Sequence, residues 1–599
     1  MNVHKPDGRL PSQPVAPMSG GREDSGGSAY RDIDRLVHAS LASLTLGISP
    51  ISLAQAWQDW ALHLAMSPGK QRQIQTKSIE KAARLQQFLL RCALAPGNAT
   101  PCITPLPQDR RFRHPAWQDF PYSAFQQSFL LAQQWWHNAT SGVPGVTRKH
   151  ERLVEFYSRQ FLDMLSPSNF WALNPEVIER TVATGGANLV AGLQNMVDDA
   201  TRLVAERPPA GVEAFRPGVE VAVTPGDVVF RNELIELIRY RPTTETVQAE
   251  PVLIVPAWIM KYYVLDLSPE SSLIRYLVAQ GFTVFCISWC NPQRDQGGLG
   301  MEDYRRLGIM AALHEVASAT GEERIHGVGY CLGGTLLSIA ASAMARDGDD
   351  RLASLSLFAA QVDFDEPGEL GLFVDESQVA MLEDVMWSEG TLDQRHMAGA
   401  FRMLRSRDLV WSRMVRDYLM GERAPMTDLM AWNADATRMP CRMQSEYLRQ
   451  LYLGNDLAQG RFRVDGRPVH VGDVRVPLFV LGTVTDHVAP WRSVFKAIRL
   501  FDTDIDFVLT SGGHNAGVVS EPGHPRRSYR HLHYGHETPH PDPDLWADSA
   551  AETAGSWWPV WADWLRARSS SEVPSDRPAR RKAMTPVICP APGTYVLQR

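Results

Sequence analysis

The stretch GVGYCLGGT at residues 327–335 constrains the fold of this chain more than any other part of the sequence. The residues leading into it, RIHGVGY, have the character of a buried strand, and those that follow, GGTLLSIAASAMARDG, have the character of a helix. Gly329 and Gly333 leave room for a sharp turn between the two elements. We therefore expect Cys331 to lie at this turn, in the nucleophile position of the pattern G-x-nucleophile-x-G.

This strand and helix belong to an alternating pattern that begins near residue 220. Short β-branched runs alternate with helical segments such as 271–281 and 304–321. Alternation of this kind predicts a mainly parallel sheet covered by helices on both faces. The Trp-rich segment 555–570 predicts a final helix that packs on the sheet. The predicted strands are residues 219–225, 228–232, 235–242, 252–258, 283–289, 324–330, 353–360, 476–486 and 505–514.

The sequence that precedes this pattern predicts helices rather than strands. Ser49-Pro50 predicts the start of a helix, because serine caps helices and proline is favoured at their first position. Further helical segments are predicted over 72–95, 122–138, 147–165 and 174–203. The stretch 106–122, rich in Arg and aromatic residues, is either an arm that clasps another surface or a packed connector.

These textures divide the chain into successive regions. A Gly-, Ser- and Pro-rich N-terminus is expected to be disordered, and a mostly helical N-terminal domain is expected to precede the α/β domain. Strand signals disappear within the α/β domain in favour of helical, Met- and Trp-rich sequence, which predicts a helical lid insertion above the sheet. The predicted boundaries are 1–29 for the disordered N-terminus, 30–205 for the helical domain, 206–570 for the α/β domain with its insertion at about 362–472, and 571–599 for a C-terminal tail that contains the basic run 577–582.

Composition excludes several classes of function. The net charge is −7 and no domain is basic, which argues against a nucleic-acid partner. No run approaches the roughly 18 apolar residues of a transmembrane segment, and no secretory signal is visible, so we expect a cytoplasmic protein. The seven cysteines are sparse and odd in number, which argues against a disulfide framework. Cys286 and Cys290 lack the CxxC spacing or histidines of a metal site, and we expect no metal.

Two later segments supply partners for Cys331. Asp486 follows one apolar strand and His514 follows the next, which reproduces the order nucleophile, acid, histidine of an α/β-hydrolase fold. We therefore predict that fold and a Cys331–Asp486–His514 triad. His487 adjoins Asp486 and is expected to shape the loop, and His326 lies within a strand and is expected to be a core histidine.

Backbone N–H groups near Cys331 are predicted to stabilise an oxyanion. Leu332, the residue after the nucleophile, supplies the first N–H group, and Ile259, in the loop after the strand at 252–258, supplies the second.

The alternative interpretation of the glycine-rich turn is a buried cysteine without catalytic role. A thiol nucleophile forms a thioester, which keeps the acyl group activated. This favours acyl transfer from a coenzyme A thioester to an alcohol over hydrolysis, although cysteine hydrolases exist.

From about residue 31 to the end, the sequence resembles the polyhydroxyalkanoate synthases of the single-subunit type. The resemblance rests on long, specific blocks rather than on the elbow alone, and residues 44–70 look like an N-terminal extension found in one branch of that family. The blocks include DRRFRHPAWQDFPY, TGGANLVAGLQNMVDD, VAVTPGDVVFRNELIELIRYRP, PAWIMKYYVLDLSPESSLIRYLVAQGFTVFCISWCNP, GYCLGGT, DFDEPGELGLFVDE, LMAWNADATRMP and APGTYV.

The resemblance implies a function and partners. It implies polymerisation of 3-hydroxyacyl-CoA into polyester with Cys331 as the acylated nucleophile, His514 as the base, and Asp486 as the group that orients His514 or helps to deprotonate the 3-hydroxyl. It also implies a homodimer at the surface of cytoplasmic polymer granules and no cofactor beyond the CoA thioester substrate. Met260, Cys290 and Asn515 depart from the family pattern, where Asn, Arg and Ile are common. A cysteine thioesterase of the same fold and an inactive granule-associated protein remain the alternatives.

Overall fold

An eleven-stranded sheet forms the centre of the computed structural model, which describes residues 25–45, 47–94, 100–392, 410–575 and 587–599. Six adjacent strands of this sheet run parallel, and nearly all their residues are buried because helices cover both faces. The alternating sequence pattern therefore predicted the layer arrangement correctly. In spatial order the six strands are β5 (Val284–Trp289), β4 (Val252–Val255), β6 (Ile325–Tyr330), β7 (Leu352–Phe358), β12 (Leu478–Thr483) and β13 (Ile505–Thr510).

Antiparallel strands extend the sheet on both sides. Beyond β5 lie β2 (Ile235–Tyr240), β1 (Gly226–Arg231) and β17 (Cys589–Pro590), and beyond β13 lie β14 (Ser528–Tyr534) and β15 (Thr553–Ala554). The prediction of a strand over 219–225 is wrong, since only an isolated bridge between Pro217 and Val221 occurs there. Backbone bonds from Ala222 to Asp266 and Leu267 replace strand pairing in this stretch.

The segment predicted as a C-terminal tail is part of the fold. Within it, β17 pairs with β1, and β16 (Glu572–Pro574) pairs with β3 (Thr246–Gln248). The fully buried carboxylate of Glu236 accepts hydrogen bonds from the N–H groups of Thr594 and Tyr595. For the described residues, the prediction of a separate tail is therefore corrected: β16 and β17 are edge strands whose pairing partners lie hundreds of residues earlier. The basic run 577–582 lies outside the described residues.

Helices cover the parallel strands on both faces, with α11 (Leu332–Asp347) buried along most of its length. The predicted final helix is present as α20 (Trp558–Arg566) and packs on the sheet as expected: the Trp561 indole donates to Ser356 of β7 over 2.9 Å. The other covering helices include α8 (Leu273–Ala279), α10 (Ala311–Thr320), α17 (Trp491–Phe495), α18 (Ala497–Leu500) and α19 (Pro543–Ser549).

Helical segments occupy the insertion between β7 and β12. It contains a short antiparallel pairing of β8 (Thr391–Leu392) with β9 (Met439–Pro440). Residues 393–409 of the predicted insertion lie outside the described residues. Its helices include a 3₁₀ turn at Glu369–Phe373, α12 (Glu376–Glu389), α14 (Ser412–Met414), which continues into a wider π-helical segment (Val415–Leu419), α15 (Asp428–Asn433), and α16 (Cys441–Glu446), which continues into another (Tyr447–Leu453).

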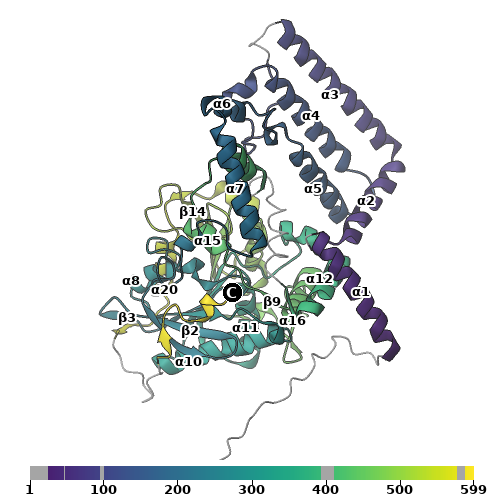
Figure 1. Cartoon of the computed structure of the whole chain (residues 1–599). Coiled ribbons are helices and arrows are strands. Elements are labelled where there is room, and N and C mark those ends of the chain that lie inside the picture. Colours follow the sequence, from purple (N-terminus) through teal and green to yellow (C-terminus); the bar gives the residue numbers. More distant parts are fainter. Residues whose placement is uncertain (1–24, 46, 95–99, 393–409, 576–586) are drawn as a thin grey trace, which may run out of the picture.

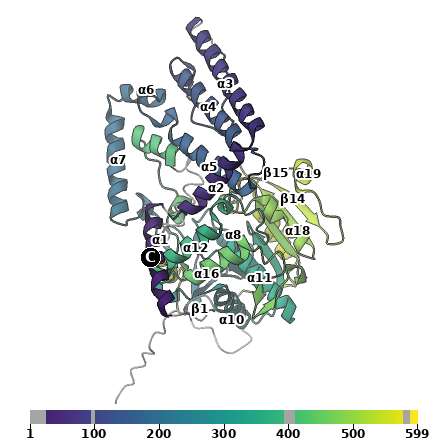
Figure 2. The same ribbon diagram turned by 90° about the vertical axis from the view of Figure 1, so that its right-hand side faces the viewer.

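The N-terminal part is helical, as predicted, and α3 and α4 project away from the sheet (Figures 1 and 2). Ser49 caps α2 at Ser52, and Pro50 is its first residue. The helix predicted over 174–203 is interrupted, because Gly185 and Gly186 adopt the left-handed conformation that ends one helix before the next begins. The helices are α1 (Ser25–Leu44), α2 (Pro50–Ala65), α3 (Pro68–Leu94), α4 (Tyr122–Thr140), α5 (Arg148–Met164), α6 (Pro175–Ala183) and α7 (Ala187–Val204).

Two further predictions concern the N-terminal segment and the stretch 106–122. Residues 1–24 of the predicted disordered segment lie outside the described residues, while α1 begins at Ser25 rather than after residue 29. The stretch 106–122 is a packed connector: the buried Arg111 guanidinium bonds Asp109 and Asp163, each over 2.7 Å. In the described part of the chain, no helix combines the length and apolar character needed to cross a bilayer.

Candidate active site

Cys331 lies between the end of β6 and the start of α11, as the glycine pattern predicts. Its backbone has φ 53° and ψ −127°, a strained conformation for a residue with a side chain. The close approach behind the turn requires glycine, since a Cβ on Gly329 would collide with Gly334, and one on Gly333 would collide with the Val255 carbonyl. The Cys331 N–H donates to the Phe358 carbonyl of β7 over 2.9 Å. The strain is therefore held by close packing, and the thiol lies at the carboxyl end of the parallel strands.

His514 and Asp486 meet at the same edge of the sheet. The Nδ1–H of His514 donates to Oδ2 of Asp486 over 2.8 Å. The other Asp486 oxygen accepts the N–H groups of Val488 and Ala489, both over 2.8 Å, and the Thr483 hydroxyl donates to Oδ2 over 3.1 Å. These bonds fix a carboxylate whose side chain is fully buried, and the carboxylate fixes the tautomer and orientation of the imidazole.

The electrostatics of His514 follow from these neighbours. Burial of the imidazole is the largest influence and lowers its pKa, but the charges of Asp486 and Cys331, together with hydrogen bonds to both, raise the pKa well above the ordinary value. The Asp486 carboxylate and the Cys331 sulfur thus both favour the protonated form of the imidazole. Such an arrangement activates a thiol for nucleophilic attack.

Asn515, one of the departures from the family pattern, is connected to this site. The hydroxyl of Tyr330, the residue before the nucleophile, donates to Oδ1 of Asn515 over 2.5 Å. The Tyr330 ring lies 5.6 Å from the His514 ring, centre to centre. The bond therefore joins the residues that flank the nucleophile and the histidine.

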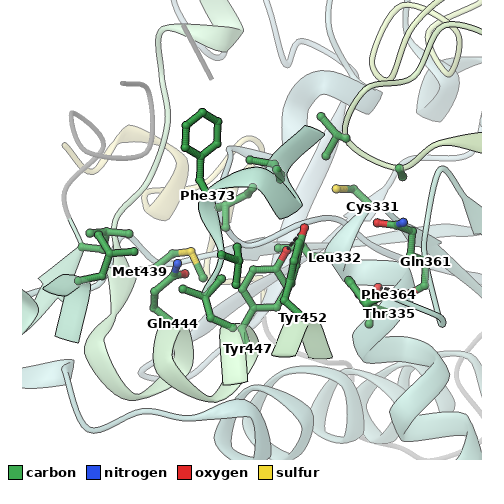
Figure 3. A pocket seen from close by; sticks show the side chains of 18 of the residues that line it. Cys331, Leu332, Thr335, Gln361, Phe364, Phe373, Met439, Gln444, Tyr447 and Tyr452 are labelled. Carbon is green, nitrogen blue, oxygen red and sulfur yellow. Dashed lines mark hydrogen bonds between the residues drawn. The ribbon is translucent and has the colours of Figure 1, made fainter. Parts of the chain in front are cut away.

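A largely apolar cavity of about 130 Å³ opens beside Cys331. Figure 3 shows Cys331 and Gln361 on one side, the rings of Tyr447 and Tyr452 in the middle, and Met439 and Gln444 on the far side. Most of the walls come from the insertion. The lining residues are Gly47, Ile48, Ile259, Cys331, Leu332, Thr335, Ala359, Gln361, Phe364, Leu370, Phe373, Val374, Gln378, Leu382, Leu392, Met439, Gln444, Tyr447, Leu448, Tyr452, Val488 and Ala489.

Leu332 and Ile259 line this cavity together with Cys331. As the first residue of α11, Leu332 has an N–H group without an acceptor inside the helix. Ile259 follows β4 in the loop expected from the sequence, and its carbonyl accepts the Thr437 N–H over 3.2 Å. The structure places both residues beside the thiol, and their oxyanion role stays a prediction.

The remaining sequence candidates take no part in the proposed triad. His326 is fully buried within β6 and bonds Ser354 and Ser569, and burial lowers its pKa to about 4. His487 contributes its backbone carbonyl to a bond from Glu369. Burial raises the pKa of Cys290 to about 11 and that of Cys286 well above the ordinary value, so neither thiol is activated. Within the described residues, no group of His, Cys, Asp or Glu could hold a metal ion.

Sequence reasoning missed the cavity walls. Tyr447 and Tyr452 lie in a helical stretch with no distinctive motif, and their hydroxyls bond each other over 3.1 Å. Gly47 and Ile48 come from the N-terminal region, where the Gln378 amide holds them by bonds to the Gly47 carbonyl and the Ser49 N–H. A helix face that lines a cavity has the same apolar pattern as one that packs against the core, so only tertiary packing identifies these residues.

Comparison with known families and proteins agrees with this architecture. Residues 108–277 match the family described as poly-beta-hydroxybutyrate polymerase (PhaC) N-terminus, residues 28–70 match poly-beta-hydroxybutyrate polymerase N terminal, and residues 250–519 match the alpha/beta hydrolase fold. The α/β-hydrolase fold predicted from the elbow and the strand pattern is thereby confirmed. Among solved structures, a monoacylglycerol lipase from Paleococcus ferrophilus aligns over 56% of this chain and 99% of its own, at 13% identity and a TM-score of 0.31.

Curated relatives cover most of the chain. The poly(3-hydroxyalkanoate) polymerase of Methylorubrum extorquens is 41% identical over 88% of this chain and 87% of its own length. The poly(3-hydroxyalkanoate) polymerase subunit PhaC of Cupriavidus necator is 36% identical over 89% of each chain. Identity of this level over this much of the chain establishes that it belongs to the poly(3-hydroxyalkanoate) polymerases, an acyltransferase family of enzymes.

Proposed function

We propose that this chain polymerises (R)-3-hydroxyacyl-CoA into polyhydroxyalkanoate and releases CoA, through a thioester on Cys331. The observation that carries the proposal is the bond between His514 and the fixed Asp486 carboxylate beside a nucleophile that opens onto an apolar cavity. The names of the relatives support the substrate class. The only small molecule the reaction needs is the CoA thioester itself.

The first step loads the enzyme. His514 takes the proton of the Cys331 thiol, and the thiolate sulfur attacks the thioester carbonyl of the substrate. The carbonyl oxygen becomes an oxyanion, which the N–H groups of Leu332 and Ile259 stabilise. As the tetrahedral intermediate collapses, the C–S bond to CoA breaks, and the CoA sulfur leaves with the proton that His514 carries. Asp486 keeps the imidazole oriented and stabilises its positive charge.

The second step extends the polyester. His514 takes the proton of an acceptor hydroxyl, assisted by Asp486, and the hydroxyl oxygen attacks the acyl-enzyme. An ester bond forms as the C–S bond between the acyl group and Cys331 breaks, and the leaving Cys331 sulfur takes the proton from His514, which regenerates the thiol. Phe364, Phe373 and the neighbouring apolar side chains restrict water around the thioester, which favours transfer to an alcohol over hydrolysis.

Access, assembly and location complete the proposal. The insertion over about 362–472 acts as a lid that moves to admit substrate, since it supplies most of the cavity wall. The protein works as a homodimer on the surface of cytoplasmic polyester granules, with the helical N-terminal part contributing to both contacts. In support, α7 presents exposed apolar side chains at Val190, Leu193, Val197 and Val204, surface of a kind that favours association with a partner or a polymer.

The test is CoA release from 3-hydroxybutyryl-CoA and from 3-hydroxydecanoyl-CoA by the wild type and by Cys331→Ala, with analysis of the product. We expect release that depends on Cys331 and yields a polyester of high mass. Free 3-hydroxy acid as the sole product would identify a thioesterase instead. No release from either substrate, by a folded wild type, would favour an inactive granule-associated protein.

Cys290→Ala is a matched control, because Cys290 is a second buried cysteine whose raised pKa keeps it protonated. It should retain CoA release, while Cys331→Ala loses it. Equal activity of Cys331→Ala and wild type would refute the proposed nucleophile.

A further inference from the structure

The loop that follows β4 and carries Ile259 is held by its carbonyl groups. The Pro256 carbonyl accepts the Trp289 indole N–H over 2.8 Å, and the Trp258 carbonyl accepts the Thr437 hydroxyl over 2.6 Å. The Lys261 carbonyl accepts the Trp432 indole N–H over 2.7 Å. These acceptors point into the surrounding protein, while Ile259 lines the cavity beside Cys331.

Lys261 attaches this loop to the last residues of the chain. Its ammonium group donates to the carbonyls of Gln598, over 2.8 Å, and Tyr595, over 3.3 Å. The residue is only 3% exposed. Burial lowers the pKa of this lysine, while the charge of Asp435 opposes the shift. A lysine almost never lies so deep without a specific partner, and here the partners are backbone carbonyls.

The segment that supplies these carbonyls is itself firmly anchored. The Tyr595 hydroxyl donates to the Asn232 carbonyl, and the amide oxygen of Gln598 accepts the Asn291 N–H over 2.7 Å. Arg438 of the insertion donates to the Arg599 backbone oxygen over 3.2 Å. Residues 594–599 thus join the Ile259 loop, the exit of β5 and the insertion (the end marked C in Figure 1).

We propose that Lys261 is a positioning residue for acyl transfer, which holds the Ile259 N–H in place for the oxyanion by binding the carbonyls of Tyr595 and Gln598. This inference rests on the proposed function of Cys331 and Ile259. An oxyanion donor acts only when its N–H lies within a few tenths of an ångström of the correct position, so a loop that loses an anchor two residues away loses transition-state stabilisation. Lys261 touches no substrate.

Two reactions of Cys331 separate positioning from general damage. Acylation by a p-nitrophenyl ester places negative charge on a carbonyl oxygen and needs the oxyanion donors. Alkylation by iodoacetamide displaces iodide at a saturated carbon and needs only the thiolate. Both are followed by the mass of the Cys331 peptide, with Cys331→Ala as the background.

We expect Lys261→Met to slow acylation by about 10- to 100-fold and to change alkylation by less than about twofold. Lys261→Arg should recover part of the acylation rate, because its guanidinium can still donate to carbonyls. Lys81→Met serves as the matched control, since Lys81 is also buried but lies on α3. It should leave both rates unchanged.

Other outcomes would overturn the role. If Lys261→Met slows both reactions equally, with a lowered melting temperature, the lysine is merely structural; if it slows neither, the loop does not depend on it. A wild type that is alkylated but never acylated would refute the proposed function as well. Should Lys261→Met fail to fold, deletion of residues 598–599 removes the Gln598 acceptor while Lys261 stays, and acylation slowed without slower alkylation is again expected.

Discussion

Two ends of the same sheet each bury a histidine, and the two sites differ in what surrounds the imidazole. His514 follows β13 at the carboxyl end and bonds Asp486 beside Cys331. His326 lies in β6, near the amino end, and bonds the hydroxyls of Ser354 and Ser569. Burial alone disfavours a charged imidazole at both sites. The pKa of His326 is accordingly lowered to about 4, whereas that of His514 is raised well above its ordinary value.

This difference shows that burial does not decide whether a histidine can transfer protons. Hydroxyl partners leave His326 neutral and make it a packing element of the strand. A carboxylate fixed by four hydrogen bonds, together with an adjacent thiol, lets His514 hold a proton inside the protein. Whether a buried histidine can hold a proton therefore depends on its charged partners, and those of His514 lie at the carboxyl end of the sheet, where the strained Cys331 turn also lies.

Removal of the carboxylate charge should make His514 resemble His326. We expect Asp486→Asn to slow acylation of Cys331 by about 10³- to 10⁴-fold, because the imidazolium loses its counter-ion and the amide can select the wrong tautomer. The pKa of His514 should fall in the same variant, which an NMR titration of its ring protons would detect. An acylation rate within tenfold of wild type would contradict the importance of the pair.

The control for that experiment is Asp506→Asn. Asp506 is another buried carboxylate, near the start of β13, and it bonds His531, His533 and the Trp564 indole away from Cys331. This variant should keep the acylation rate within about threefold of wild type, even if its melting temperature falls.

The arrangement of residues at the carboxyl end of the sheet, where the proposed site lies, could be predicted from sequence because its requirements are local. An abrupt turn from a strand into a helix around a nucleophile requires glycine on both sides, and Gly329 and Gly333 supply it here. Asp486 and His514 each directly follow an apolar strand. In a parallel sheet the carboxyl ends of the strands meet at one edge, so strand position alone brings these residues together. The His326 interpretation succeeded for the same reason, since a residue inside a central strand is buried.

Other features depend on contacts between distant segments and carry no local signal. The pairing of β17 with β1 joins residues near 589 to residues near 228, and a two-residue strand has no periodicity to detect. The cavity walls at Gly47 and Tyr447 come from helical regions whose pocket side is decided by packing. The predicted strand over 219–225 failed in the opposite way. Its alternation of apolar residues is correct for a strand, but its backbone bonds Asp266 and Leu267 instead of forming a strand ladder.

At the amino end of the sheet, we expect His326 to affect the stability of the protein rather than its activity. An unfolded His326 takes up a proton below about pH 6.5, but the folded residue does so only near pH 4. Because the unfolded state binds more protons in this interval, the free energy of unfolding should fall by up to about 3 kcal/mol as the pH drops from 6.5 to 4. The raised pKa of His514 works in the opposite sense: its stabilisation is complete below pH 6.5 and is lost as the pH rises through the folded value.

His326→Gln isolates the first contribution. At pH 7 the variant should be less stable than wild type, since glutamine cannot reproduce both serine bonds, and it should acylate Cys331 within about twofold of the wild-type rate. Urea midpoints of unfolding for wild type and His326→Gln at pH 7, 5.5 and 4.5 measure how this difference in stability depends on pH. The gap in stability between the two proteins should narrow steadily as the pH falls. A gap that stays constant would show that His326 titrates normally in the folded protein.

The smallest expected effect concerns Asn515, which links the two chain segments that the carboxyl end brings together. Asn515→Ile restores the residue that the family pattern favours but leaves the buried Tyr330 hydroxyl without its acceptor, at a cost of about 1 kcal/mol in stability. Because Tyr330 lies against His514, acylation should slow by only about three- to tenfold. Tyr330→Phe should cost less than this, and the double variant should be little slower than Asn515→Ile, since both changes remove one shared bond. Fully additive effects in this cycle would mean that Asn515 and Tyr330 act independently, and that the hydrogen bond does not help to place His514 beside the thiol.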